Sequence, residues 1–179
     1  MNIHHHPIEG LYEIIAHSHK DNRGCFFEVC NPSHLETLGI SYKIAQVNQS
    51  VSKKGVLRGL HFQRKPQAQS KLVRVLSGCI FDVAVDLRKH APTFGQWVGI
   101  TLEKNDHFFL IPEYCAHGFL TLSDDAVVEY FCSNPYNPLL EESIRYDDKT
   151  LNIKWQAPIN LVSEKDLNAP HFDPNRTYF

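Results

Sequence analysis

The feature that most constrains the fold is a series of short apolar segments separated by turn residues between Lys71 and Cys132. No stretch between these segments suits the crossover helix that a parallel βαβ unit requires. This spacing predicts an all-β sandwich or barrel. The segments span residues 71–76, 79–87, 97–102, 107–111, 116–122 and 126–132, and the turns include 92–95, 105–106, 112–113 and 123–125.

The segment 79–87 alternates as a strand does. One predicted face carries Phe81, Val83, Val85 and Leu87, and the other carries Asp82, Ala84 and Asp86. Because Ser77-Gly78 separates this segment from 71–76, we predict a β-hairpin between the two.

Regular structure is sparser at the two ends of the chain. A short helix is predicted over Pro32–Leu38, with Asn31 as its cap and Gly39 at its end. The tail from Trp155 to Phe179 is predicted to be loop that packs over a sheet, with short helical turns around 163–166. Without internal repeats or a linker, residues 1–179 are expected to form one domain.

Composition excludes several classes of function. The formal net charge of −2 and the isolated basic pairs give no basic face for nucleic acid. No apolar run is long enough to span a bilayer, and residues 1–10 lack the pattern of a signal peptide. The five cysteines show no C-x-x-C spacing. We therefore expect a soluble, cytoplasmic protein with reduced thiols and no membrane partner.

The most unusual segment surrounds His61. In a regular strand over 58–63, His61 lies on the face opposite Arg58. A lone histidine in an interior is more often structural than catalytic, because hydrogen bonds can satisfy it there. Here, however, the segment has too many polar side chains for an ordinary apolar core, namely Arg58, His61, Gln63 and Lys71.

Other chemistries find less support in the residues. A histidine metal site is disfavoured because position 63 is Gln and because His90, His107 and His117 are scattered. The chain has no G-x-S-x-G nucleophile elbow and no glycine-rich phosphate loop. The cysteines lie in apolar segments typical of inert burial. The remaining candidate is acid–base chemistry. His61 suits the role of base because the ordinary pKa of histidine lies near neutrality.

Several motifs together resemble the dTDP-4-dehydrorhamnose 3,5-epimerase family. The opening Asp21–Glu28 is similar to the family's D-x-R-G-x-F-x-E motif, and Gly55–Gln63 is similar to its central signature. The resemblance runs in order from about Asp21 to Asp166. Its other motifs lie at 46–52, 69–75, 81–88, 92–95, 116–119 and, more loosely, 144–148.

The resemblance implies a fold, an activity and partners. The expected fold is a double-stranded β-helix, which is a cupin-like jelly-roll, with a few short helices. The expected protein is a homodimeric epimerase (an isomerase of dTDP-rhamnose and cell-surface polysaccharide biosynthesis) that needs no metal or organic cofactor. Its expected substrate is a nucleotide sugar, a dTDP-4-keto-6-deoxyhexose inverted at C3 and C5.

The resemblance also assigns roles to individual residues. His61 is the expected base, Asp166 orients it, and Tyr130 is the proton donor on the opposite face of the sugar. Without the resemblance, Tyr130 is read as a core aromatic beside Val128. The expected substrate-binding residues are Arg23, Glu28, Gln46, Asn48, Arg58, Lys71, His117, Glu141 and Lys165.

Some positions depart from the family pattern. Tyr114-Cys115, Phe131, Pro135 and Tyr146 replace residues that are common there, and they flank the expected pocket. Three alternatives therefore stay open: an epimerase that inverts a single carbon, a sugar-binding jelly-roll without catalysis, and a metal-dependent cupin.

Overall fold

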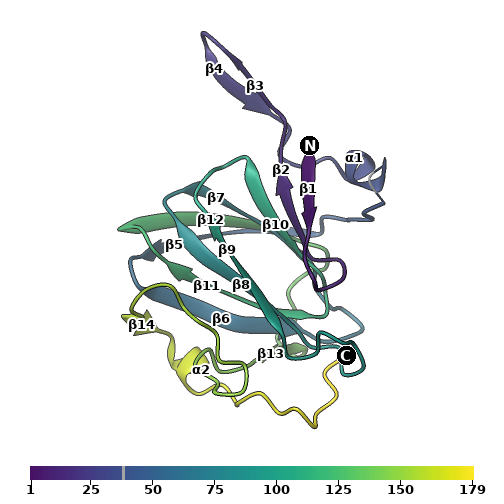
Figure 1. Ribbon diagram of the computed structural model, residues 1–179, viewed down its shortest axis with the longest axis vertical. Coiled ribbons are helices and arrows are strands. Elements are labelled where there is room, and N and C mark those ends of the chain that lie inside the picture. Colours follow the sequence, from purple (N-terminus) through teal and green to yellow (C-terminus); the bar gives the residue numbers. More distant parts are fainter. Residues whose placement is uncertain (38) are drawn as a thin grey trace.

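The computed structural model describes residues 1–37 and 39–179. Most of its regular structure is strand, and the two helices are short (Figure 1). The helices are α1 (Pro32–Thr37) and α2 (Glu164–Leu167). The strands are β1 (Asn2–His5), β2 (Tyr12–Ile15), β3 (Ser18–Asp21), β4 (Gly24–Phe27), β5 (Gln46–Lys53), β6 (Val56–Gln63), β7 (Lys71–Ser77), β8 (Ile80–Asp86), β9 (Trp97–Leu102), β10 (His107–Ile111), β11 (Cys115–Thr121), β12 (Asp125–Cys132), β13 (Glu141–Ser143) and β14 (Leu161–Val162).

Two six-stranded sheets, antiparallel except for β14, face each other. The first sheet has the order β1-β2-β10-β7-β12-β5, and the second has the order β13-β6-β11-β8-β9, with β14 parallel to β6. A third, two-stranded sheet pairs β3 with β4. The prediction of an all-β jelly-roll with a few short helices is confirmed, and the strands predicted over 71–132 are present with small shifts at their ends.

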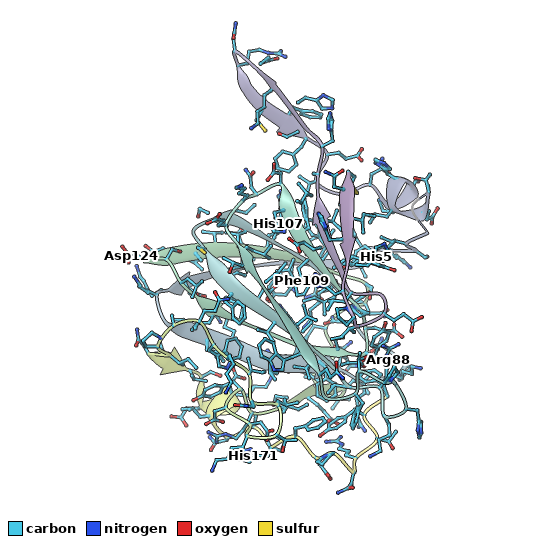
Figure 2. All side chains as sticks on the ribbon, in the orientation of Figure 1. His5, Arg88, His107, Phe109, Asp124 and His171 are labelled. Carbon is cyan, nitrogen blue, oxygen red and sulfur yellow. The ribbon has the colours of Figure 1, made fainter. Side chains whose placement is uncertain are left out.

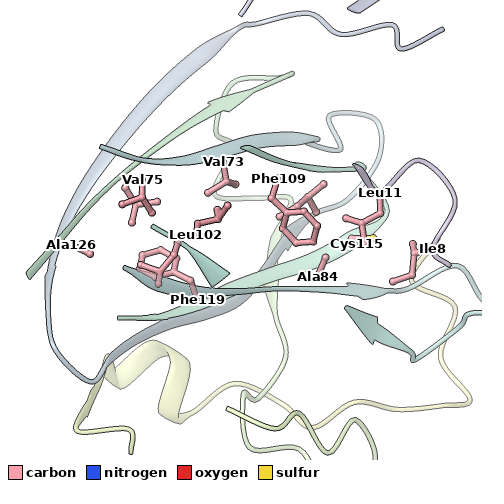
Figure 3. Packing of buried hydrophobic residues seen from close by; sticks show 13 residues of the cluster. Ile8, Leu11, Val73, Val75, Ala84, Leu102, Phe109, Cys115, Phe119 and Ala126 are labelled. Atoms are coloured by element: carbon pink, nitrogen blue, oxygen red, sulfur yellow. The ribbon is translucent and has the colours of Figure 1, made fainter. Parts of the chain in front are cut away.

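The main core fills the space between the two sheets. Val73 and Phe109 from the first sheet pack against Ala84 and Phe119 from the second, and all four are fully or almost fully buried (Figure 3). Alternating side chains of each strand reach this core, which is why the period-2 pattern in the sequence located the strands.

The outer face of the second sheet is also covered. Phe81, Val83 and Val85 of β8 pack against Phe172 and other apolar residues of the C-terminal tail. β8 is therefore buried on both faces, and every one of its residues is buried. The tail was predicted as loop with short helical turns around 163–166; it contains α2 at that place and also the short strand β14, which was not predicted.

The hairpin predicted between residues 71–76 and 79–87 is wrong. β7 pairs with β10 and β12, whereas β8 pairs with β9 and β11 in the other sheet. The chain crosses from one sheet to the other at Gly78, which has φ +84° and lies against the backbone of Asp125. A glycine turn allows either connection, so its presence did not determine the partner strand.

The helix predicted after Asn31 is confirmed over Pro32–Thr37. The His34 backbone N–H donates to Asn31 Oδ1 at 3.3 Å, as a cap requires. Gly39, at φ +78°, follows the helix as predicted. Leu38, which was included in the predicted helix, lies outside the described residues.

The β3–β4 hairpin stands clear of the sandwich (Figure 1). Phe109, by contrast, lies within the sandwich, in the core between the two large sheets (Figure 2). Phe26 in this hairpin is 73% exposed. A two-stranded hairpin with an exposed aromatic is only marginally stable by itself.

Candidate active site

A bulge in β6 turns two functional side chains into the same cavity. In the pairing with β11, Arg58 lies opposite Phe119 and His61 opposite His117, so β6 has one more residue than its partner between these pairs. The extra residue breaks the alternation, and Arg58 and His61 both line the cavity. The prediction that they lie on opposite faces is therefore wrong.

Glycine makes this bulge possible. Gly59 has φ +129°, and a Cβ there would lie 2.5 Å from Gly118 Cα and 2.8 Å from the carbonyl oxygen of His117. Only a residue without a side chain allows the two strands to approach so closely.

His61 is paired with a buried carboxylate from the tail. Its Nε2 lies 2.6 Å from Asp166 Oδ1, and the Gly59 N–H donates to Asp166 Oδ2 at 3.2 Å. An ionised carboxylate only accepts hydrogen bonds, so Nε2 carries the proton and Nδ1 keeps the lone pair of a base. Asp166 lies in α2, where the side chain of Ser163 caps the helix by accepting the Asp166 N–H at 3.1 Å.

The environment of Asp166 keeps it ionised. Burial raises the pKa of the Asp166 carboxyl, but hydrogen bonds from His61 and Gly59 outweigh this effect and hold the pKa below its usual value. His61 is therefore supported by an ionised carboxylate, the arrangement that stabilises an imidazolium when the ring takes a proton.

Two cations beside this pair have no carboxylate of their own. Arg58 Nε donates to Ser52 Oγ at 3.0 Å, and Lys71 Nζ lies 3.5 Å from the His61 carbonyl oxygen. In residues 1–37 and 39–179 neither cation forms an ion pair with a carboxylate. Burial lowers the pKa of the Lys71 ammonium. Such cations favour an anion between them.

A second histidine–carboxylate pair lies on the neighbouring strands. His117 Nε2 of β11 is 2.6 Å from Asp82 Oδ1 of β8, and both side chains are almost completely buried. Burial lowers the pKa of His117, although Asp82 opposes this, and Lys71 adds to the lowering. His117 is therefore a neutral imidazole held in one orientation by Asp82.

Tyr130 enters the cavity from the other sheet. It lies on β12, whereas His61 lies on β6, so the two side chains approach from facing sheets. Burial raises the pKa of the Tyr130 phenol, and the charge of Arg58 acts against that rise. The phenol is protonated at neutral pH and can act as a proton donor.

These residues surround one open cavity of about 380 Å³. This volume suits a group the size of one sugar, and because the cavity is open, the rest of a larger ligand can extend out of it. The cavity is lined by Val56, Leu57, Arg58, His61, Lys71, His117, Phe119, Tyr130, Leu161, Val162, Ser163, Lys165 and Asp166.

A connected set of polar groups lies next to the cavity. Lys165 Nζ donates to Glu141 Oε2 at 2.5 Å, and the Tyr136 hydroxyl donates to the same oxygen at 2.7 Å. Gln46 Oε1 accepts the Tyr136 N–H at 2.8 Å, and Gln46 Nε2 donates to Asn48 Oδ1 at 2.8 Å. Burial raises the pKa of Glu141, but these hydrogen bonds and the Lys165 charge hold it below its usual value.

Arg23 and Glu28 are not brought to this cavity. Arg23 lies in the turn of the β3–β4 hairpin, where its side chain is 90% exposed and pairs with Asp21 at 2.6 Å. Glu28 contacts Asn31 and His34 near α1. Arg23 belongs to the hairpin that points away from the sandwich (Figure 1), and Glu28 follows that hairpin in the chain.

The sequence analysis missed two residues of this region, Asp82 and Tyr136. Asp82 was placed on the polar face of its strand, and an acidic residue in a strand buried on both faces was a signal that it needs an interior partner. Tyr136 follows β12 in an irregular segment, where no periodicity marks it.

In residues 1–37 and 39–179 no three histidine, cysteine, aspartate or glutamate side chains gather as a metal site. The same part of the chain contains no helix with the length and apolar character needed to cross a membrane. All five cysteines are free thiols.

Comparison with known proteins identifies close similarity. The sequence profile of the family described as dTDP-4-dehydrorhamnose 3,5-epimerase matches residues 5–174. The dTDP-4-dehydrorhamnose 3,5-epimerase of Methanothermobacter thermautotrophicus is 44% identical over 175 residues, which cover 96% of this chain and 94% of that protein.

Solved structures agree in fold. A crystal structure of dTDP-4-dehydrorhamnose 3,5-epimerase from Elizabethkingia anophelis NUHP1 superposes with a TM-score of 0.93 at 41% identity, covering 99% of both chains. A dTDP-6-deoxy-D-glucose-3,5-epimerase from Legionella pneumophila Philadelphia 1, solved in complex with dTDP-4-keto-L-rhamnose, superposes with a TM-score of 0.90 at 45% identity. That match covers 95% of this chain and 92% of the other.

Proposed function

The chain belongs to the dTDP-4-dehydrorhamnose 3,5-epimerase family, and from this we propose that it inverts C3 and C5 of a dTDP-4-keto-6-deoxyhexose. The proposed reaction converts dTDP-4-dehydro-6-deoxyglucose to dTDP-4-dehydro-L-rhamnose. The observation that carries the proposal is the placement of His61, with its carboxylate, and Tyr130 on facing sheets around one cavity.

The first step is removal of a proton by His61. C3 and C5 both flank the C4 ketone, so loss of either proton gives an enolate with its charge on the C4 oxygen. Lys71 and Arg58 supply unpaired positive charge in the cavity for that oxygen. Asp166 stabilises the imidazolium that forms on His61.

The second step is return of a proton to the other face of the same carbon. Tyr130 is the proposed donor because it is protonated at neutral pH and comes from the sheet opposite His61. Removal from one face and return to the other inverts the carbon. This chemistry requires an acid, a base and a stabilised oxyanion, so we propose no cofactor.

The remaining polar residues are proposed to hold the nucleotide sugar. Gln46, Asn48, Glu141 and Lys165 form the connected set beside the cavity, and the neutral His117 lies at its floor beside Lys71. A diphosphate requires several donors, of which Lys165 supplies one within the chain. We also propose that the chain works as a single domain in the cytoplasm, where its five free thiols stay reduced.

We propose a homodimer in which the β3–β4 hairpin contributes to the partner's cavity. The hairpin stands clear of its own sandwich and exposes Phe26 and Arg23 (Figure 1). A symmetric dimer would cover this hairpin and bring Arg23 and Glu28 to a substrate diphosphate or nucleotide bound by the second copy.

Mixing two inactive variants is expected to restore activity if the hairpin serves the partner. Arg23→Ala and His61→Ala dimers should each be nearly inactive. When they are unfolded together and refolded at equal amounts, half the dimers are mixed, and each mixed dimer holds one complete site. About one quarter of the wild-type rate should return. No recovery, with mixed dimers verified by mass spectrometry, would place Arg23 in the cavity of its own chain, and a fully active Arg23→Ala dimer would place it outside the reaction.

Asp166→Asn is expected to lower kcat by about 10²–10⁴-fold without unfolding the protein, because the amide can donate to Nε2 and favour the wrong tautomer of His61. The acidic limb of the pH profile should change as well, since the variant lacks the carboxylate that supports the imidazolium. An unchanged rate and pH profile would show that Asp166 has only a structural role.

The direct test of the proposed function is product identification. The protein is incubated with dTDP-4-keto-6-deoxyglucose, and NMR determines the configuration at C3 and C5. Inversion at both carbons supports the proposal. Inversion at one carbon would assign a monoepimerase, and binding without turnover would assign a sugar-binding jelly-roll.

A further inference from the structure

The inward face of β5 carries four polar side chains, and two of them, Ser50 and Ser52, have no role in the proposed mechanism. Gln46 and Asn48 belong to the set beside the cavity, and Ser50 and Ser52 continue the same face toward the β5–β6 turn. Ser52 is 4% exposed, and its Oγ accepts a hydrogen bond from Arg58 Nε at 3.0 Å. Ser50 Oγ is buried and has no hydrogen-bond partner within residues 1–37 and 39–179.

The contact between Ser52 and Arg58 joins the two sheets. Ser52 belongs to β5 in the first sheet, and Arg58 belongs to β6 in the second. Arg58 Nη2 also donates to the Val51 carbonyl oxygen at 3.4 Å, a longer contact on the same strand. The Ser52 hydroxyl is therefore the side-chain group that fixes the direction of an otherwise exposed guanidinium.

The strand that carries Tyr130 is the neighbour of β5 in the first sheet. β5 and β12 are paired, with Ser52 opposite Ala126 and Asn48 opposite Tyr130. Arg58 and Tyr130 line the same cavity, and Arg58 acts against the burial that raises the pKa of the phenol. A change in the position of Arg58 would alter both the charge offered to the substrate and the acidity of Tyr130.

We propose that Ser52 is a positioning residue, whose hydroxyl holds the Arg58 guanidinium on the cavity wall toward Tyr130. This inference rests on the proposed function only for its effect on turnover. The placement of Arg58 relative to the phenol can be tested without any reaction.

The kinetic test compares Ser52→Ala with Ser50→Ala. Both variants remove a buried hydroxyl from the same face of the same strand, but only the first removes a partner of Arg58. Ser52→Ala should lower kcat by about tenfold, the usual effect of losing a hydrogen bond to a charged group, with a smaller change in KM. Ser50→Ala should keep the wild-type kcat.

The second test reads the phenol directly. Tyr130 is replaced by 3,5-difluorotyrosine, whose more acidic phenol ionises within the range where the protein is folded, and its ¹⁹F resonance is followed against pH. A nearby cation favours the phenolate, so loss of Arg58 from its position should raise the pKa of this group. Ser52→Ala should shift the ionisation equilibrium about tenfold toward the phenol, and Ser50→Ala should leave it unchanged.

The outcomes separate this inference from the proposed function. If the wild-type protein does not epimerise the sugar but Ser52→Ala still raises the pKa of the fluorinated phenol, the function is wrong and the positioning role stands. If Ser52→Ala and Ser50→Ala give the same titration, the positioning role is overturned. A lower kcat in Ser52→Ala without any change in the titration overturns it as well.

Discussion

His61→Ala is expected to lower kcat by about 10²–10⁴-fold or more, because it removes the only base in the proposed reaction. Both C3 and C5 depend on this imidazole, so exchange of either proton with solvent should fall with the rate of inversion. NMR of the substrate in D₂O measures both quantities in one experiment.

The loss should be confined to chemistry. His61 is half-buried at the edge of an open cavity, so its removal leaves no large void in the core. The melting temperature and the affinity for dTDP, measured by calorimetry, should therefore stay close to the wild-type values. A variant that keeps a near-native kcat would exclude His61 as the base.

The chain offers a matched control for this variant. His107 is also half-buried and also paired with a carboxylate, since its Nε2 lies 2.7 Å from Glu13 Oε1 (His107 is labelled in Figure 2). It belongs to β10 and does not line the cavity of His61. His107→Ala should keep the wild-type kcat, so an equal loss in both variants would indicate damage to the fold rather than loss of a base.

The sequence predicted the strands well because each strand buries one or both faces in a repeating pattern. β9 and β10 were predicted with their observed ends, since polar or turn residues bound both. The same pattern does not predict which strands pair with each other. The turn at Gly78 could close a hairpin or cross between sheets, and only the packing of β7 and β8 into separate layers determines which occurs.

The site was harder to predict from local patterns for two physical reasons. The bulge at Gly59 breaks the alternation of β6, so an ideal strand placed Arg58 on the wrong face. The carboxylate of Asp166 is 105 residues from His61 in the sequence, in a tail without periodicity, and only the family resemblance joined the two.

The resemblance predicted residues but not their arrangement in space. It named Arg23 and Lys165 together as substrate-binding residues. The structure places Lys165 on the cavity and Arg23 on a hairpin that points away from it. A sequence motif indicates which residues a site requires. It does not indicate whether each residue serves the cavity of its own chain or that of a second copy.

Tyr130→Phe is expected to separate proton abstraction from inversion. The variant keeps His61, Asp166 and the cations of the cavity, so the enolate should still form. It lacks the group proposed to return a proton to the opposite face. Inversion should fall by about 10²-fold or more, whereas exchange at the original face should fall far less.

Turnover in D₂O makes this difference visible. The wild-type product should carry deuterium at both C3 and C5, because each new proton comes from a donor that exchanges with solvent. In Tyr130→Phe, His61 can return a solvent-derived deuteron to the face from which it took the proton. Deuterium should then accumulate in substrate whose configuration has not changed, and NMR detects this directly.

A tyrosine that only fills the core would give another pattern. Losing its hydroxyl would slow exchange and inversion together or leave both unchanged, as is expected for the control Tyr12→Phe on β2, outside the cavity. Equal losses of exchange and inversion in a folded Tyr130→Phe protein would exclude Tyr130 as the acid without affecting the assignment of His61. His61 and Tyr130 approach the cavity from facing sheets. If they act as base and acid on opposite sides of one carbon, Tyr130→Phe must lose more inversion than exchange.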